Sequence, residues 1–447
     1  MVRRAELQIL HPGRLVAIAF ASVITIGTVL LSLPLATSSG ARPPVLTALF
    51  TATSATCVTG LIIVDTPTYW SGFGQTVIAA LIQLGGFGIM TFASILAVAA
   101  SRRIGLRFRM ATQAETGTLE LGDVRRILFG VTVFTLLFEG MLAVVLTGRL
   151  WLSYDESFGR ALGDGVFHSI SAFNNAGFAL FSDSLEGFVT DAWITLSVAV
   201  AVIVGGIGFP VLLELRRSPF RPSTWSMHAK LTVGTTAVLI VVGAAAFLAF
   251  EWSNPETLQG LDNDGKALGT IFQSVTPRTA GFNTIDFSEM RESTWLVTGV
   301  LMFIGGGSAS TAGGIKVTTF ALLGFVIWSE LRGEPDVNVF GRRAAGASQR
   351  QALGIALLGV GVVVISTLIL LVITPFPMSQ VLFEAISAFS VVGLSTGITG
   401  ELTSTGHVLI IVMMFLGRIG PATLGAALVL RERDRLYRYP EERPIIG

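Results

Sequence analysis

Four short segments of this 447-residue chain share a pattern suited to ion coordination. Each begins with serine, continues through small and apolar residues, and ends in glycine followed by a large apolar residue. The segments are Ser54 to Leu61, Ser171 to Phe178, Ser274 to Phe282 and Ser387 to Leu394, of which the third is one residue longer. Each pattern predicts a short helix that enters the membrane, turns at the glycine and returns as extended backbone.

Four such segments around one axis would form a ring of backbone carbonyl oxygens. Rings of this kind replace the hydration shell of a potassium ion. Glycine suits the turn because it adopts backbone angles closed to other residues. The short helices would point the negative ends of their dipoles at the pore, which favours a cation. The stretch Thr56 to Gly60 is also a loose relative of the TVGYG filter of potassium channels.

Long apolar runs must position these segments. Only 13% of the residues are charged, which excludes an ordinary soluble enzyme, since soluble proteins have about 25%. A bilayer core of about 30 Å needs roughly 20 apolar residues in a helix. The sequence accordingly predicts eight spanning helices, within 15–33, 66–101, 127–148, 192–213, 231–250, 293–315, 351–383 and 402–430. A signal peptide is the alternative for the first run, which follows Arg3 and Arg4.

The same order of elements repeats four times along the chain. Each unit has one span, an outer segment with the glycine pattern, and a second span with a glycine cluster, in 84–88, 204–208, 304–307 and 416–420. Such clusters allow close packing between helices. The expected fold is therefore an all-α membrane protein with four repeats around one pore, namely 1–110, 111–220, 221–345 and 346–430, followed by a tail at 431–447. Arginines gather between and after the units, which predicts that both termini are cytoplasmic.

Two features of the second spans are unusual. The stretch 294–330 would be roughly 55 Å long as one helix, and its segment Gly305 to Gly314 has no large side chain, so a break is expected there. Arg418 lies in the middle of the last span, where an unpaired charge costs several kcal/mol. It must face the pore, a water-filled cavity or a partner, and an ion pair with Glu384 or Glu139 is the alternative.

With these motifs the sequence resembles the Trk/Ktr/HKT superfamily of potassium transporters, and most of all its KtrB-type membrane subunit. The stretches 175–178 and 279–283 make the resemblance specific, and it extends from the first span to Arg418. It implies potassium uptake across the cell membrane through a filter formed by Val58, Thr59, Gly60, Asn175, Ala176, Gly177, Thr279, Ala280, Gly281, Val391, Val392 and Gly393. It also implies an intramembrane gate at 305–315, with Gly305, Gly306, Gly307, Ser308, Gly313, Gly314, Lys316 and Arg418.

The resemblance further implies a homodimer with a cytoplasmic nucleotide-binding ring of the RCK type. No cofactor is expected on the chain itself. Potassium would occupy the pore, either alone or with sodium as an activator. The stretch 313–316 lacks the spacing of a phosphate-binding loop. With a net charge of +1, nucleic acid is not an expected partner.

Other hypotheses stay open at this point. One is a sodium-selective or poorly selective cation pathway, and another is a subunit without a pore. A membrane-embedded enzyme is the third, for which His168 near Asp164 gives the only hint. The repeated glycine pattern argues against the last two, so the chain is not expected to be an enzyme. Arg278 is odd beside a cation filter and is expected to point away from the axis into a salt bridge.

Overall fold

The computed structural model describes residues 12–88, 91 and 121–430, and helices dominate this part of the chain. Predictions for 1–11, 89–90, 92–120 and 431–447 lie outside the described residues, including the C-terminal tail and the arginines at 102–109. The described chain forms an all-α membrane protein with one small hairpin, in which β1 (Asn338–Val339) pairs with β2 (Arg342–Arg343). The sequence analysis did not predict this hairpin.

The first half of the chain holds two sets of helices. The first set is α1 (Pro12–Leu31), η1 (Pro34–Ala36), α2 (Val45–Cys57), α3 (Thr66–Tyr69) and a helix over 72–88. The second set is α5 (Leu121–Ser153), α6 (Phe158–Phe173), η2 (Glu186–Phe188), α7 (Ala192–Ile207), α8 (Phe209–Arg217) and η3 (Pro222–Thr224).

The second half repeats the order of a long helix, a short helix and a further long segment. Its third set is α9 (Met227–Glu251), α10 (Asn263–Val275), α11 (Glu292–Ile304) and α12 (Val317–Arg332). Its fourth set is α13 (Gly346–Ile373), α14 (Met378–Ser390), η4 (Ile398–Glu401) and α15 (Ser404–Leu430). In each of the four sets the first long helix packs against the short helix that follows it, α1 on α2, α5 on α6, α9 on α10 and α13 on α14.

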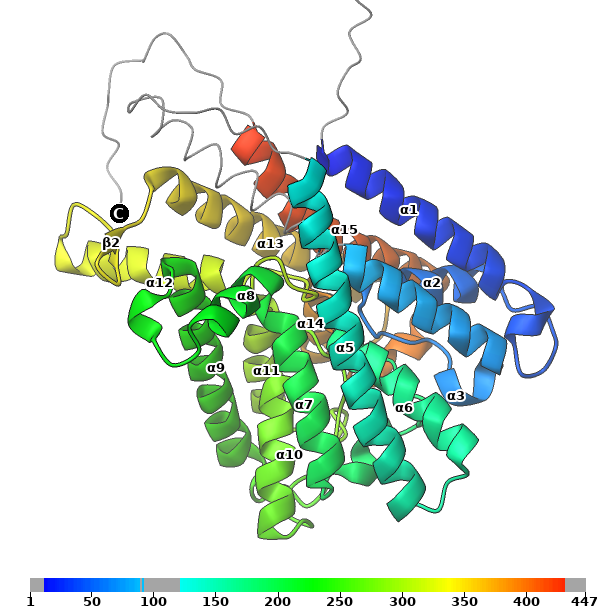
Figure 1. Ribbon diagram of the computed structural model, residues 1–447. Helices are drawn as coiled ribbons and strands as arrows, with labels where there is room; N and C mark the ends of the chain where they lie inside the picture. The colour runs from blue at the N-terminus through cyan, green and yellow to red at the C-terminus, as the bar shows by residue number, and fades with distance from the viewer. Residues whose placement is uncertain (1–11, 89–90, 92–120, 431–447) are drawn as a thin grey trace, which may run out of the picture.

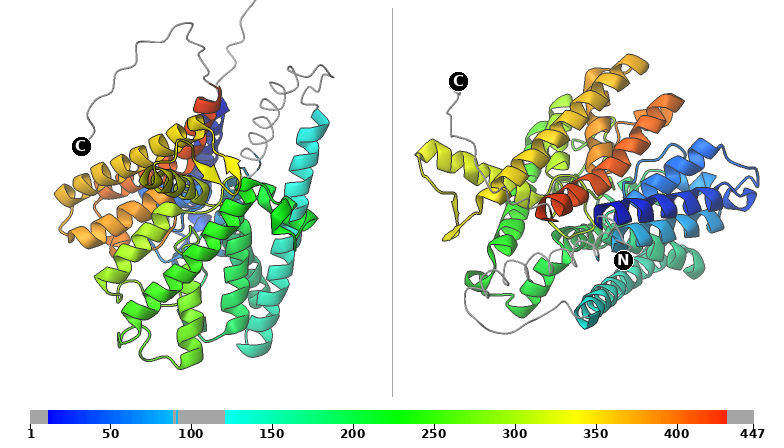
Figure 2. Two further views of the ribbon diagram at one scale, coloured as in Figure 1. Left: turned by 90° about the vertical axis from the view of Figure 1, so that its left-hand side faces the viewer. Right: turned by 90° about the horizontal axis from the view of Figure 1, so that it is seen from above.

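These sets surround a common centre. Figure 1 shows the short helices α2, α6, α10 and α14 each beside the long helix of its own set. Seen from above in Figure 2, the chain proceeds around the centre from blue through cyan and green to orange. Each short helix ends among buried residues, so the four loops that follow them meet inside the protein.

Among the described helices, three are long and apolar enough to cross a membrane unaided. They lie at Phe129–Ser153, Met227–Glu251 and Gly346–Ile373, and the bent pair α7 and α8 would be a fourth. Shorter apolar helices cover Leu15–Leu31, Val45–Cys57, Glu292–Ile304 and Ser404–Gly420. The number of eight spans and the boundaries of the four repeats stay predictions.

One expected span is interrupted. The run 192–213 was expected to form a single helix, but it breaks at Gly208 and the two parts are bent by 101°. Gly208 has a φ of +99°, which favours glycine. The amide of Phe209 donates to Ala309 O at 3.3 Å instead of to its own helix. A contact with a distant loop therefore takes the place of a helical hydrogen bond.

Candidate cation pathway

The four loops that follow the short helices share one backbone conformation. In each loop a non-glycine residue with left-handed angles stands two positions before a glycine with positive φ. These pairs are Val58 and Gly60 (φ +60° and +94°), Asn175 and Gly177 (+61° and +69°), Thr279 and Gly281 (+71° and +77°), and Val391 and Gly393 (+58° and +94°). Left-handed angles are uncommon outside glycine. Their recurrence in all four loops therefore marks one local structure.

The four glycines form a closed ring in chain order. A Cβ added to Gly177 would lie 2.7 Å from Gly281 Cα, and one on Gly281 would lie 3.4 Å from Gly393 Cα. Similarly, a Cβ on Gly393 would lie 3.0 Å from Gly60 Cα, and one on Gly60 would lie 3.1 Å from Gly177 Cα. The ring therefore has no room for side chains at these positions.

Backbone carbonyls occupy the space between neighbouring glycines. The residue that precedes each ring glycine in the sequence points its carbonyl oxygen at the ring glycine of the neighbouring loop. These oxygens belong to Ala176, Ala280, Val392 and Thr59, which face Gly60, Gly177, Gly281 and Gly393 in turn. Ten of the twelve residues predicted from the resemblance are buried around this ring, and Gly177 and Gly393 are partly exposed. Such a ring presents partial negative charge without an ionised side chain, which suits an unhydrated cation.

A hydroxyl group of each short helix holds its loop in place. Gly60 N donates to Ser54 Oγ at 3.1 Å, and Gly393 N donates to Ser387 Oγ at 3.2 Å. Ser171 Oγ donates to Phe178 O at 2.7 Å. In the third loop Thr276 Oγ1 donates to Phe282 O, whereas Ser274 Oγ donates to Ile240 O of α9. In this longer loop Thr276 therefore makes the hydrogen bond that a serine makes in the other three loops, and Ser274 does not.

The glycine clusters of the second spans pack against the short helices. A Cβ on Gly85 would collide with Thr56 O, one on Gly205 with Phe173 O, and one on Gly417 with Phe389 O. In these three sets the carbonyl stands four positions before the glycine of the ring. The close approach explains the second repeated motif of the first, second and fourth sets as helix packing, whereas Gly306 and Gly307 of the third set face Gly206 O and Ile207 O of α7.

A cavity of about 440 Å³ opens on one side of the ring. All four ring glycines line it, together with the acidic side chains of Asp65, Asp183, Glu186 and Asp286. Asn283 Nδ2 donates to Glu186 Oε1 at 2.6 Å, which joins the loops of the second and third sets. Burial, together with Asp286 and Asp183, raises the pKa of Glu186 to about 7. The cavity therefore attracts cations toward the ring.

A non-helical segment lies on the other side of the ring. Helix α11 ends at Ile304 and α12 begins at Val317, so the expected break is present over residues 305–316. A Cβ added to Gly313 would lie 2.5 Å from Val391 Cβ, and one added to Gly314 would lie 3.2 Å from Ser390 Cα. This intramembrane segment thus packs directly against the fourth loop.

The first part of the same segment binds the broken helix of the second set. Gly307 N donates to Gly206 O at 2.7 Å, and Thr311 N donates to Gly205 O at 3.3 Å. Ser308 Oγ and Thr318 Oγ1, which are 3.0 Å apart, form a hydrogen bond at the start of α12. Gly305 has a φ of +62° and follows the last turn of α11. Polar backbone within a membrane needs such partners.

The buried side chain of Arg418 and the partly buried side chain of Lys316 hold the intramembrane segment. Arg418 Nη1 donates to Thr311 O, and its Nη2 donates to Gly85 O at 3.3 Å. Lys316 Nζ donates to Ala312 O at 2.5 Å and to Gly313 O at 3.1 Å. Arg418 is only 3% exposed. It connects the segment to the first set and makes no ion pair with Glu139 or Glu384.

The side chain of Asn175 also reaches this segment. One end of its carboxamide lies 3.3 Å from each of Thr311 Oγ1, Phe173 O and Val202 O. Because two of these atoms are carbonyl oxygens, this end is the nitrogen, which donates to all three. The neighbouring Asn174 points elsewhere, toward Glu139. The second loop and the intramembrane segment are therefore directly hydrogen-bonded.

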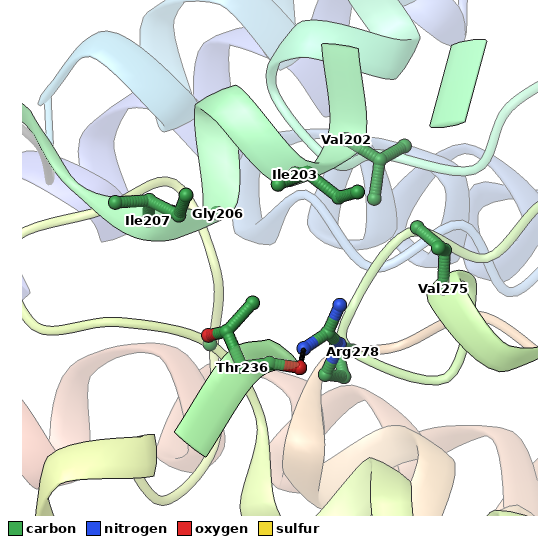
Figure 3. Close-up of a pocket in the computed structure, with 8 residues that line it drawn as sticks. Val202, Ile203, Gly206, Ile207, Thr236, Val275 and Arg278 are labelled. Atoms are coloured by element: carbon green, nitrogen blue, oxygen red, sulfur yellow. Dashed lines mark hydrogen bonds between the residues drawn. The ribbon is translucent and has the colours of Figure 1, made fainter. Parts of the chain in front are cut away.

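Arg278 makes no salt bridge with any described residue, so the expectation from the sequence was wrong. Its Nη1 donates to Thr236 O at 2.9 Å, while its Nε is buried without a partner. Figure 3 shows the guanidinium beside Thr236 and across from Val202, Ile203 and Gly206. A backbone carbonyl of α9 thus takes the place of the expected carboxylate.

The histidine that hinted at an enzyme has a structural role. His168 is 2% exposed, its Nδ1 lies 2.7 Å from Asp164 O, and its Nε2 accepts from Leu180 N at 3.1 Å. The Asp164 carboxylate lies 3.7 Å from Arg160 Nε instead. Among the described residues no group of acidic, histidine and cysteine side chains could hold a metal ion.

Comparison with known proteins places this geometry in context. The family model described as "TrkH: Cation transport protein" matches residues 12–438. The Ktr system potassium uptake protein B of Bacillus subtilis is 41% identical, with 98% of this chain and 97% of that protein aligned. The Potassium/sodium uptake protein NtpJ of Enterococcus hirae is 34% identical over 98% of both chains. The crystal structure of the potassium transporter TrkH from Vibrio parahaemolyticus matches with a TM-score of 0.71 at 19% identity, and covers 95% of this chain and 86% of that one.

Proposed function

The chain belongs to the TrkH family of cation transport proteins, and we propose that it takes up potassium across the cell membrane through the glycine ring. One observation carries this proposal. Four loops with the same left-handed geometry bring four glycines and four carbonyls into one closed ring. The ring lies at the base of an acidic cavity. A carbonyl ring selects by replacing water of hydration, and the membrane potential would drive the cation inward.

The intramembrane segment 305–316 is the gate of this pathway. Its glycines let it pack against the fourth loop, and its fold depends on a few hydrogen bonds to Arg418, Lys316 and the broken helix. Loss of these contacts would free the segment without unfolding a long helix. The positive charges of Arg418 and Lys316 add an electrostatic barrier below the ring.

The chain works with other protein subunits. The relatives named as Ktr system proteins are described as one component of a system. Together with the resemblance to the KtrB type, this supports a second copy of the chain and a cytoplasmic nucleotide-binding subunit of the RCK type. Sodium is either an activator or a second substrate, since one relative is named for both potassium and sodium.

Uptake of radioactive rubidium tests the proposal. Purified protein in liposomes would take up rubidium, driven by a gradient of potassium trapped inside, and external potassium or sodium would compete. Competition by potassium alone supports a potassium pathway, and equal competition by sodium supports the less selective alternative. Absence of uptake both in the wild type and in a variant with residues 305–314 deleted would contradict the proposal.

A further inference from the structure

Glu139 is a buried acidic side chain in the middle of α5 that the proposed pathway does not use directly. It is 6% exposed, and no basic side chain of the described residues pairs with it. Instead, two amides bind its two carboxylate oxygens. Gln83 Nε2 donates to Oε2 at 3.2 Å, and Asn174 Nδ2 donates to Oε1 at 3.0 Å. A charge kept at this depth without a counter-ion needs a reason.

The three side chains form a closed hydrogen-bonded triangle. Asn174 Nδ2 also donates to Gln83 Oε1 at 2.9 Å, so each residue contacts both others. Because the two amides donate to different oxygens of Glu139, both of its oxygens act as acceptors while Gln83 in turn accepts from Asn174. The identity of Glu139 therefore sets the orientation of both amide groups.

Asn174 is the residue through which this triangle reaches the ring. It ends α6 and directly precedes Asn175, the left-handed residue of the second loop. Its side-chain oxygen makes no hydrogen bond. This oxygen packs directly against Gly86, where a Cβ would lie only 2.0 Å from it. Asn174 Nδ2 donates to Ile170 O at 2.9 Å as well. The position of the Asn174 side chain thus depends on its nitrogen, and so on Glu139.

The same position differs among the four loops. Three residues before each ring glycine stand Cys57, Asn174, Arg278 and Ser390. Cys57 is a buried free thiol, and the hydroxyl of Ser390 has no partner. Only Asn174 and Arg278 connect their loops to a neighbouring long helix through a side-chain hydrogen bond. Side-chain hydrogen bonds therefore hold two adjacent loops of the ring, the second and the third. For the second loop the acceptor is the carboxylate of Glu139.

We propose that Glu139 is a positioning residue that fixes the second filter loop through Asn174 and so helps determine the preference for one cation over another. This inference rests on the proposed function of the ring. A purely structural role would also bury Glu139, but it would not link this side chain to the choice of ion.

Exchange of two side chains separates the two roles. In E139Q no orientation of the three amides satisfies all contacts, because in each orientation either two donors or two acceptors face each other. The double variant E139Q/Q83E moves the carboxylate to the other corner of the triangle and allows all three hydrogen bonds, with only the one between positions 83 and 139 reversed in direction. E251Q is the matched control. Glu251 is also buried and accepts hydrogen bonds, from Asn254 at 2.7 Å and Thr257 at 2.8 Å, at the end of α9.

The measurement is the concentration of potassium or of sodium that raises the melting temperature of the purified protein by half its maximum. Bound ions stabilise the folded protein, so this readout does not require an open gate. We expect the potassium-to-sodium preference to fall about tenfold in E139Q, the effect of one hydrogen bond. The preference should return in the double variant and stay unchanged in E251Q.

The outcomes distinguish this inference from the proposed function. A wild-type protein stabilised by neither ion contradicts the cation pathway itself. A wild-type protein that prefers potassium, with the same preference in folded E139Q, overturns only the role of Glu139, as does a double variant that fails to recover. If E139Q does not melt cooperatively, E139D decides, since its shorter carboxylate cannot reach both amides. An unchanged preference in E139D then overturns the inference.

Discussion

Replacement of Arg418 by glutamine should open the pathway. Glutamine retains a polar side chain but lacks both the charge and the second arm that reaches Gly85. The guanidinium donates to Thr311 O of the intramembrane segment, and a hydrogen bond from a charged donor contributes about 1.5–3 kcal/mol. Since about 1.4 kcal/mol corresponds to a tenfold change, the closed population should fall by about tenfold to about a hundredfold.

The charge of Arg418 adds a second effect. A cation about 10 Å from this guanidinium is repelled by roughly 2 kcal/mol at an effective dielectric constant of about 20. R418K keeps the charge but cannot make both hydrogen bonds. A rate for R418K between those of the wild type and R418Q would separate the two contributions.

The assay is the initial rate of rubidium uptake into liposomes without a regulatory subunit. R149Q is the control, because Arg149 binds Asp191 at 2.8 Å at the far end of α5 and does not touch the gate. We expect R418Q to raise the rate and R149Q to leave it unchanged. Equal rates for R418Q and the wild type, with equal amounts of folded protein, would refute the barrier role of Arg418.

Three further changes test other parts of the pathway. Gly60→Ser places a side chain against Ala176 O, 2.5 Å from the position of its Cβ, and should lower the preference for potassium over sodium by about tenfold in competition assays. Gly85→Ala drives a methyl group into Thr56 O, and overpacking of about 1–3 kcal/mol should lower the melting temperature by several degrees. Burial and two neighbouring carboxylates raise the pKa of Glu186 to about 7. Rubidium uptake at low concentration should therefore rise as the pH increases through 7 and Glu186 becomes charged, and E186Q should remove this dependence.

The sequence predicted features that depend on local backbone geometry. Glycine recurs where φ is positive, so the positions of Gly60 and Gly393 in equivalent loops could be read from the repeat. The interruption after Ile304 was predictable as well, because repeated glycines with no large side chain between them destabilise a helix. The resemblance to the Trk/Ktr/HKT superfamily also predicted the all-α membrane fold.

Features that depend on distant contacts could not be predicted. Glu139 and Asn174 are 35 positions apart, and no spacing rule joins them. The break at Gly208 also has a local signal, since Pro210 follows two positions later and proline favours the first turn of a new helix. The contact between Phe209 N and Ala309 O, which stabilises the break, depends on the folded intramembrane segment.

Four buried ionisable side chains among the described residues share one feature that bears on the mechanism. Glu139 and Glu384 accept hydrogen bonds from amide or hydroxyl groups, and Arg278 and Arg418 donate to backbone carbonyls. Hydrogen bonds stabilise a buried charge without cancelling it, whereas an ion pair would cancel most of its field at a distance. On the proposed function, each of these charges would therefore act on a cation in the ring as well as on the segment that it holds. Neutral substitutions at these positions should alter both the geometry of the pathway and the energy of the ion within it.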